Sequence, residues 1–267
     1  MAPVFDGARA KVDHAFEHLQ SLDADLARAV GGQAYAIGGH YKPESAEIDL
    51  YALGTEFPRL QWGVRIGDCL HNLRSALDHI TWQLALDHLG REPTDDEARQ
   101  IQFPLEVKSA SFQSAKVRRH VSAAHIPMLD QFQPYHAGND APRHRLAILH
   151  RLSNIDKHRV VHAAAVVPAE FHLQFVEGSG IESYDSIELF SGQTMHEETQ
   201  IGVLRGVVAT RSDAKVAGYG PFSAGVVLDA PGDPILHHEA VTNVLGTVGE
   251  AVDVVVKWFE AEFAPAP

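Results

Sequence analysis

The chain has 267 residues, of which 45% are hydrophobic and 21% are charged, and its formal net charge at pH 7 is −13. This composition excludes a disordered chain, a collagen-like chain and a disulfide-rich mini-protein, and the length suffices for one large domain or two small ones. The excess of acids also excludes nucleic-acid binding through overall charge, so such binding would need a local basic patch.

The cellular compartment follows from three sequence features. Cys69 is the single cysteine, which excludes an intrachain disulfide and favours a reducing compartment. The first residues lack the basic and apolar regions of a secretory signal, and no stretch is long and apolar enough to span a bilayer. We therefore expect a cytoplasmic protein with no membrane partner. The 17 histidines are the one unusual count, and histidine is the common acid–base residue near neutral pH.

The first 158 residues show mostly helical periodicity. Apolar residues recur every three or four positions, whereas Ile48, Leu50 and Ala52 alternate with polar residues as in a half-buried strand. Thr94 and Glu97 have the spacing of a capping box. The predicted elements, in chain order, are a helix at 7–29, strands within 33–54, a helix at 59–90, a short helix after Thr94, two short helices at 109–120 and 122–132, a loop at 137–142 and a helix at 143–158.

The rest of the chain is β-like until its last helix. Strand patterns occur at 160–167, at Phe171, Leu173 and Phe175, and at 187–189, 201–210 and 225–228, with loops expected at 191–199 and 211–221. Asp233 and Pro234 are typical of a helix start. The apolar stripe from Val241 to Phe259 then predicts a helix at 235–261.

These elements predict a single α+β domain over residues 1–267. Its four main helices, near 7–29, 59–90, 143–158 and 235–261, would form a four-helix bundle, and the β-rich region near 160–228 would form an additional antiparallel sheet. The alternative is a division into two subdomains near residue 160.

The helix at 59–90 carries the most informative polar face. On a helical wheel its core side holds Leu70, Leu73, Leu77, Ile80 and Leu84, and its opposite side holds His71, Ser75, Asp78 and Trp82. Arg74 and His79 flank this polar side, and Asp78 can pair with Arg74 one turn earlier. Ordinary solvated faces are rich in Lys and Glu, which are absent here. A simple solvated face with a common ion pair remains the alternative interpretation.

A second polar run lies at residues 150–159. His150, Asn154, Lys157 and His158 share one face of the predicted helix, whereas Asp156 falls on its apolar side. A buried carboxylate needs a partner, so we expect Asp156 to reach an Arg or His on another helix. Residues 108–159 carry nine Lys or Arg and three acids, so a local basic patch lies on an acidic protein.

The run from Arg74 to His79 has the Arg-x4-His form and resembles that of HEPN-type helical-bundle proteins. The Leu-Arg-x-x-Leu-Asp-His run and the later Asn-x-x-Lys-His-Arg run also resemble those of a group of uncharacterised bacterial proteins. The HEPN resemblance implies a four-helix fold and a metal-independent ribonuclease of toxin or defence type, acting as a homodimer without a cofactor or metal.

The same resemblance implies roles for particular residues. His79 would act as general acid or base, Arg74 would stabilise the charged phosphate, and Asp78 would orient them. RNA would be the partner, held through the basic patch. The expected substrate-binding residues are His71, Asn154, Lys157, His158 and Arg159.

Two other functions stay open at the level of sequence. The first is a non-enzymatic ligand-binding or interaction protein with a possible protein partner, in which the His, Arg and Asp side chains form a structural polar network. The second is a metal-dependent hydrolase. Its ligands would come from His71, Asp78, His79, His158 and His162.

Overall fold

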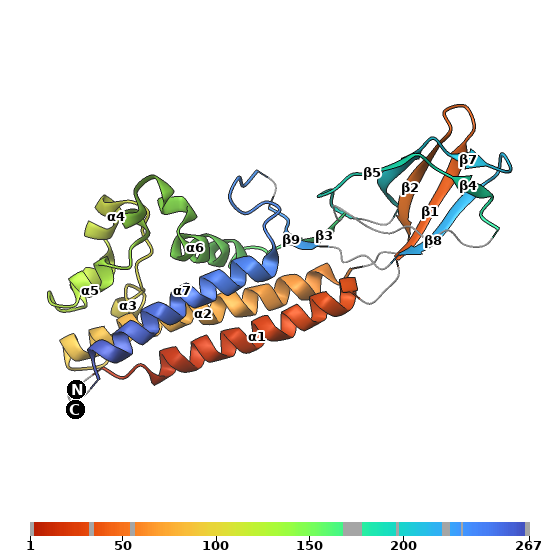
Figure 1. The fold of residues 1–267 in the computed structure, drawn as a ribbon. Coiled ribbons are helices and arrows are strands. Elements are labelled where there is room, and N and C mark those ends of the chain that lie inside the picture. The colour runs from red at the N-terminus through yellow and green to blue at the C-terminus, as the bar shows by residue number, and fades with distance from the viewer. Residues whose placement is uncertain are drawn as a thin grey trace. The chain divides into compact units, whose positions relative to one another are not determined.

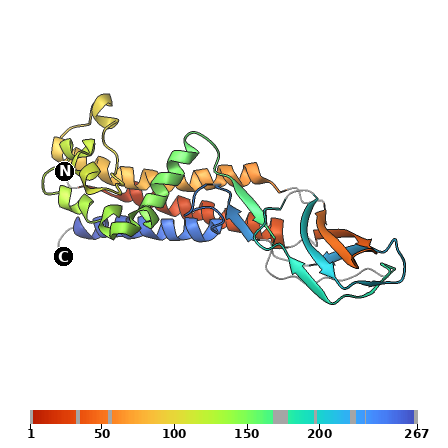
Figure 2. The same ribbon diagram turned by 90° about the horizontal axis from the view of Figure 1, so that it is seen from above.

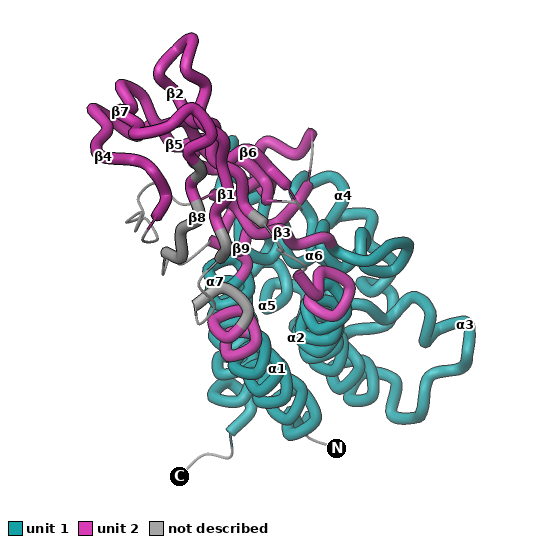
Figure 3. The backbone as a smooth tube through the Cα atoms, turned by 90° about the vertical axis from the view of Figure 1, so that its right-hand side faces the viewer, with its two compact units in different colours: residues 1–22, 63–161, 242–267 teal, residues 23–62, 162–241 magenta. Residues whose placement is uncertain are grey.

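The computed structural model describes residues 3–31, 35–53, 57–167, 178–195, 198–220, 225–230 and 232–264. The fold is α+β with antiparallel strand pairing (Figure 1). The chain forms two compact units (Figure 3): unit 1 comprises Met1–Leu22, Gly63–Val161 and Thr242–Pro267, and unit 2 comprises Asp23–Trp62 and His162–Val241. The sequence predicts one domain, and the alternative division near residue 160 coincides with a passage from unit 1 to unit 2.

Unit 1 is helical. Most of α1 (Asp6–Gly31), α2 (Arg59–Leu89) and α7 (Val241–Glu262) belongs to it, and these three long helices lie side by side in both views (Figures 1 and 2). The shorter elements are α3 (Asp95–Ala98), α4 (Ser109–Gln113), η1 (Lys116–Arg119), α5 (Ile126–Asp130), η2 (Pro134–Arg143) and α6 (Arg145–Asp156), where η denotes a 3₁₀ helix.

The three long helices pack through the faces that the apolar periodicity predicts. The five residues assigned to the core side of α2 are all buried: Leu70, Leu73, Leu77, Ile80 and Leu84. Gly249 of α7 lies against Phe16 of α1 and Leu73 of α2. Arg9 of α1 donates to Glu260 of α7, with Nη2 and Oε2 2.8 Å apart. Burial of these apolar side chains is the main stabilising contribution.

Two glycines of α2 allow the chain after α6 to approach closely. A Cβ on Gly63 would stand 2.6 Å from the carbonyl oxygen of Val161, and one on Gly67 would collide with the carboxylate of Asp156. Only a residue without a side chain fits at these contacts. This approach places the C-terminal end of α6 directly beside the polar face of α2.

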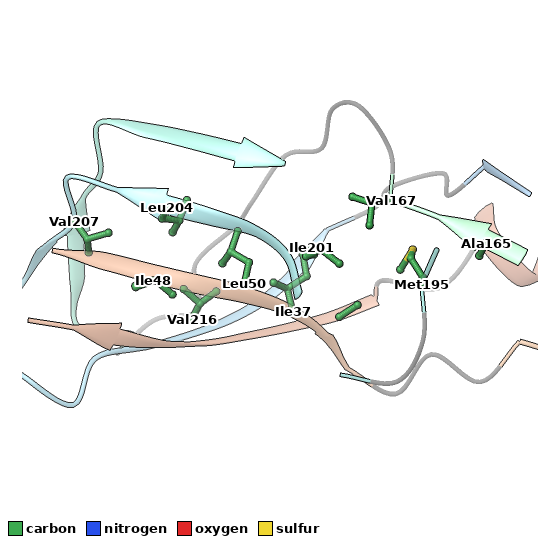
Figure 4. Close-up of a cluster of buried hydrophobic side chains, with 11 residues drawn as sticks. Ile37, Ile48, Leu50, Ala165, Val167, Met195, Ile201, Leu204, Val207 and Val216 are labelled. Atoms are coloured by element: carbon green, nitrogen blue, oxygen red, sulfur yellow. The ribbon is translucent and has the colours of Figure 1, made fainter. Parts of the chain in front are cut away.

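Unit 2 contains a five-stranded antiparallel sheet with the strand order β5-β6-β2-β1-β8. Its buried face includes Ile48 and Leu50, as their alternation predicts, together with Leu204 and Val216 (Figure 4). Two short pairs, β3 with β9 and β4 with β7, complete the unit. The strands are β1 (Tyr35–Lys42), β2 (Glu47–Leu53), β3 (Ala163–Val166), β4 (Ile181–Ser183), β5 (Ser186–Leu189), β6 (Thr199–Arg205), β7 (Val208–Ala209), β8 (Lys215–Gly220) and β9 (Gly225–Leu228).

Several predicted boundaries need correction. The expected loop at 211–221 contains β8, which pairs with β1 although its small and polar residues lack a strand pattern. The loop expected at 137–142 lies within η2. The last helix begins at Val241 rather than at 235, because His238 has a φ of 67° and interrupts the turn that Asp233 caps. The alternation at Phe171, Leu173 and Phe175 lies outside the described residues.

The other predicted elements agree with the structure. The helices at 7–29, 59–90 and 143–158 correspond to α1, α2 and α6, and Thr94 and Glu97 form the capping box that begins α3. Among the described residues, no helix has both the length and the apolar character needed to cross a bilayer.

Candidate functional site

The polar face of α2 is accessible. His71 and His79 are exposed, and Ser75, Asp78 and Trp82 are half-buried, whereas the opposite face of the helix is fully buried. This arrangement agrees with the helical wheel. The face can therefore contact a ligand or solvent without any rearrangement of the helix.

Arg74 is the least exposed cation of this face and holds a specific network. Its Nη2 donates to Asp78 Oδ1 at 2.9 Å and to the carbonyl oxygen of Phe103 at 2.7 Å. The backbone N–H of Phe103 donates to the same carboxylate oxygen at 2.8 Å. The Arg74 side chain is 12% exposed and that of Asp78 30% exposed. The predicted pair is confirmed, and it ties α2 to the segment before α4.

Burial makes Asp78 the costly member of this network. Burial raises the pKa of Asp78, and the charge of Arg74 and the hydrogen bond from the Phe103 amide each offset part of that rise. Both hydrogen bonds go to Oδ1, and they hold the carboxylate against Arg74 and the Phe103 backbone. Its geometry suits it to hold Arg74 in place.

His79 lies on a different side of α2 from Arg74. Five positions along a helix turn the side chain by about 140° from the starting direction. The His79 ring lies against the N-terminal turn of α1, where a Cβ on Gly7 would stand 2.7 Å from His79 Nδ1. The structure therefore brings Arg74 together with Asp78 and Phe103, and His79 together with α1. It does not bring Arg74 and His79 to one point within the chain.

The polar residues of α6 lie near Arg74. Asn154 and His150 are hydrogen bonded, with Asn154 Nδ2 and His150 Nε2 3.0 Å apart. The charges of Arg74 and Lys157 both lower the pKa of His150, although burial is the larger cause of that lowering. Lys157 also lowers the pKa of Asp78. Asn154 and Lys157, predicted from the second polar run, therefore belong to the surroundings of Arg74.

Asp156 and His71 face each other at the other end of this region. Burial and the charge of Asp68 raise the pKa of Asp156, whereas His71 lowers it. Asp156 therefore lies near a histidine of another helix, as expected. The two side chains form no ion pair in the described part of the chain. His71 and Asp156 therefore interact through space.

His158 and Arg159 lie beyond the end of α6. Both side chains are exposed, and neither forms an ion pair with a described residue. Because α6 ends at Asp156, His158 and His162, two of the metal ligands expected for a hydrolase, do not lie one turn apart on a helix. In the part of the chain that the structure describes, no three His, Cys, Asp or Glu side chains are arranged to hold a metal ion.

A pocket of about 270 Å³ opens beside Arg74 and His150. Its walls come from α2, the segment 99–106, the residues around η1 and α6. Four cationic or ionisable basic side chains line it, namely Arg74, Arg99, Lys116 and His150, together with one acid, Glu106, and the amides of Gln100 and Gln102.

Arg74 also has an unsatisfied donor. Its Nη1 is buried and has no hydrogen-bond partner among the described residues, although Nη2 is fully used by Asp78 and Phe103. A buried guanidinium N–H without an acceptor is costly. We therefore define the Arg74 pocket as the cavity lined by Arg74, Arg99, Glu106, Lys116 and His150 with their neighbouring amides.

Five residues of the pocket carry no site motif in the sequence, namely Arg99, Gln100, Gln102, Glu106 and Lys116. The basic surplus of residues 108–159 includes Lys116 and was the one available signal. Nothing in the sequence shows that the segment 99–106 folds back onto α2, because the Phe103 backbone makes that contact. Comparison of the chain with protein-family models, curated proteins and solved structures gives no match.

Proposed function

We propose that unit 1 binds a small anionic ligand in the Arg74 pocket. The observation that carries this proposal is the mainly basic lining of a pocket to which Arg74, held by Asp78 and Phe103, contributes. An oxyanion in this pocket would balance the charge of the guanidinium, which is well suited to phosphate and carboxylate groups. The proposal corresponds to the ligand-binding alternative of the sequence analysis.

The size and charge of the pocket support a small ligand. A volume of about 270 Å³ lies near the lower end for ligand pockets, which suits a small molecule better than a polymer. Lys116 is exposed and can turn toward an anion, as can Arg99 on exchanging its exposed ion pair with Asp96, whereas Arg74 is held by Asp78. One oriented cation and two adaptable ones favour a ligand with a phosphate or similar group.

In this proposal the Arg74–Asp78–Phe103 network is the support of the binding site. It orients the guanidinium before the ligand arrives, which lowers the entropy lost on binding. The helices α1, α2, α6 and α7 would then act as the four-helix bundle of the sequence analysis, with the pocket at the side of α2 that faces α6.

The test measures ligand-dependent stability. We expect pyrophosphate and sulfate to raise the thermal unfolding midpoint of the wild type above that in chloride of equal ionic strength, because a ligand that binds the folded state stabilises it. Lys116→Gln should reduce the rise. Arg74→Gln should abolish the rise in the unfolding midpoint. If Arg74→Gln does not fold, Lys116→Gln still tests the proposal, because Lys116 is an exposed residue.

The matched control is Lys108→Gln. Lys108 belongs to the same basic segment and is exposed, but it does not line the pocket. The control variant should respond to the anions as the wild type does. Equal responses of all variants, or no anion-specific response of the wild type, would contradict the proposal.

A metal-independent ribonuclease is our second candidate. It is favoured by the accessibility of the α2 face between Arg74 and His79, where Ser75, Asp78 and Trp82 are half-buried rather than covered. Because the two flanking side chains point to different sides of α2, the active site would need a second copy of the chain to bring one Arg74 near another His79. RNA cleavage in EDTA separates this candidate from the first.

A further inference from the structure

The Arg74 pocket contains one side chain that ordinarily titrates near neutral pH. Among its lining residues only His150 is a histidine. His150 is exposed at its outer side and projects from α6, and its Nε2 lies 3.0 Å from Asn154 Nδ2. With the Asn154 amide nitrogen donating, Nε2 is the acceptor, which corresponds to the tautomer of the neutral imidazole with its proton on Nδ1.

The surroundings of His150 favour its neutral form when the pocket is empty of anion. Burial lowers the pKa of His150, and Arg74 on α2 and Lys157 on α6 lower it further. Arg99 and Lys116 line the same pocket, and Glu106 is its one acid. The balance of charge therefore opposes a further positive charge, and an anion among these groups would reverse that balance.

We infer that His150 is a proton-coupled ligand contact: a tetrahedral oxyanion, such as the phosphate group of a small molecule, binds between Arg74 and His150 and binding protonates His150. This inference rests on the proposed function and adds its regulation by pH. The proton comes from solvent and bonds to Nε2, and the Asn154 amide turns so that its oxygen accepts that N–H. Affinity then increases as pH falls through the titration of His150.

The experiment uses sulfate as the probe, because sulfate does not itself titrate near neutral pH. The pH titration of the His150 imidazole is followed by nuclear magnetic resonance in sulfate and in chloride of equal ionic strength. His150→Gln identifies the signal by its loss, and its amide oxygen can still accept from Asn154. Asn154→Asp gives a second identification, because a neighbouring carboxylate raises the midpoint of the same signal.

We expect sulfate to raise the titration midpoint of His150 by about one pH unit, as a close anion does at a partly exposed site. The sulfate affinity of the wild type should rise by about tenfold in total as the pH falls through the two midpoints of His150. The affinity of His150→Gln should stay constant over the same range.

The outcomes of this experiment separate the inference about His150 from the proposed anion binding. If Lys116→Gln weakens sulfate binding but sulfate leaves the titration midpoint of His150 unchanged, the inference is overturned and the proposed function stands. If chloride at equal ionic strength raised the His150 midpoint as much as sulfate does, ionic screening would explain the rise. That result would also overturn the inference. Retained pH dependence in His150→Gln would assign the proton to another group. Failure of sulfate to bind at any pH would overturn the proposed function and the inference together.

Discussion

The carbonyl oxygen of Val161 lies 2.6 Å from the position that a Cβ on Gly63 would occupy. This contact between α2 and the chain just after α6 brings Asp156 and Lys157 beside the polar face of α2. The Val160 side chain and the Val161 carbonyl oxygen form the obstacle together, so rotation of a side chain alone cannot relieve the contact. The relative placement of α2 and α6, and with it the Arg74 pocket, depends on the absence of a side chain at position 63.

Gly63→Ala should therefore destabilise the protein although alanine favours helix. We expect a loss of about 1 to 3 kcal/mol in the free energy of unfolding, as for other overpacked sites. Gly246→Ala on α7 is the control, because nothing lies within 4 Å of the added methyl group. That variant should gain about 0.5 to 1 kcal/mol from helix propensity. Urea unfolding of both variants measures the difference, and similar effects at the two sites would contradict the packing argument.

Asp78→Asn should separate stability from ligand binding. The asparagine oxygen can still accept from Arg74 and Phe103, but the charge that balances the buried guanidinium is lost. We expect the free energy of unfolding to fall by about 1 to 3 kcal/mol. Sulfate affinity should rise by about fivefold, because removal of one nearby negative charge contributes about 1 kcal/mol at the protein surface.

Asp140→Asn is the control for this prediction, since Asp140 is exposed on η2 and does not line the pocket. Chemical denaturation and sulfate titration of the two variants provide the readouts. Weaker sulfate binding by a folded Asp78→Asn protein would show that Asp78 contributes to the ligand site in another way.

The ribonuclease candidate predicts cleavage of single-stranded RNA in EDTA. In that case His79→Ala should lower the rate by about 10²- to 10⁴-fold, which is typical for loss of a general acid or base. Arg74→Ala mixed with His79→Ala should recover part of the activity if each active site combines residues from two copies. Lys116→Gln should affect this activity less than it affects anion binding. Absence of cleavage by the wild type would contradict the ribonuclease candidate.

Stability should fall as the solution becomes acidic, in part because of His125. This imidazole is buried, its Nδ1 has no partner among the described residues, and burial lowers its pKa despite the nearby Asp87. The unfolded chain then binds a proton more readily than the folded protein. The contribution of His125 to stability is therefore complete above the ordinary histidine pKa of about 6.5 and is lost as pH decreases from there.

His125→Phe tests this assignment, because it removes the titration and keeps an aromatic ring beside Phe263. Its free energy of unfolding should depend less on pH between about 6.5 and 5 than that of the wild type. Part of the dependence should remain, since burial also lowers the pKa of His144 and His150. Parallel pH curves for the two proteins would exclude His125 as a source of the acid sensitivity.

The sequence by itself determined the elements that depend on local periodicity. The apolar stripes of α1, α2 and α7, the alternation in β2 and the capping box of α3 all involve residues a few positions apart. The pairing of Arg74 with Asp78 is of the same kind, because one helical turn separates them. For the same reason the exposed and buried faces of α2 were predictable residue by residue.

The tertiary structure alone decided which distant segments meet. β8 is a strand because it pairs with β1, although its sequence lacks a strand pattern. The Phe103 backbone completes the Arg74 network from outside the helix, and Gly63 admits the chain after α6. Backbone hydrogen bonds and close backbone contacts use groups that every residue carries, so the sequence contains little sign of them. The Arg74 pocket depends on such contacts, whereas the polarity of the helix face beside it follows from periodicity.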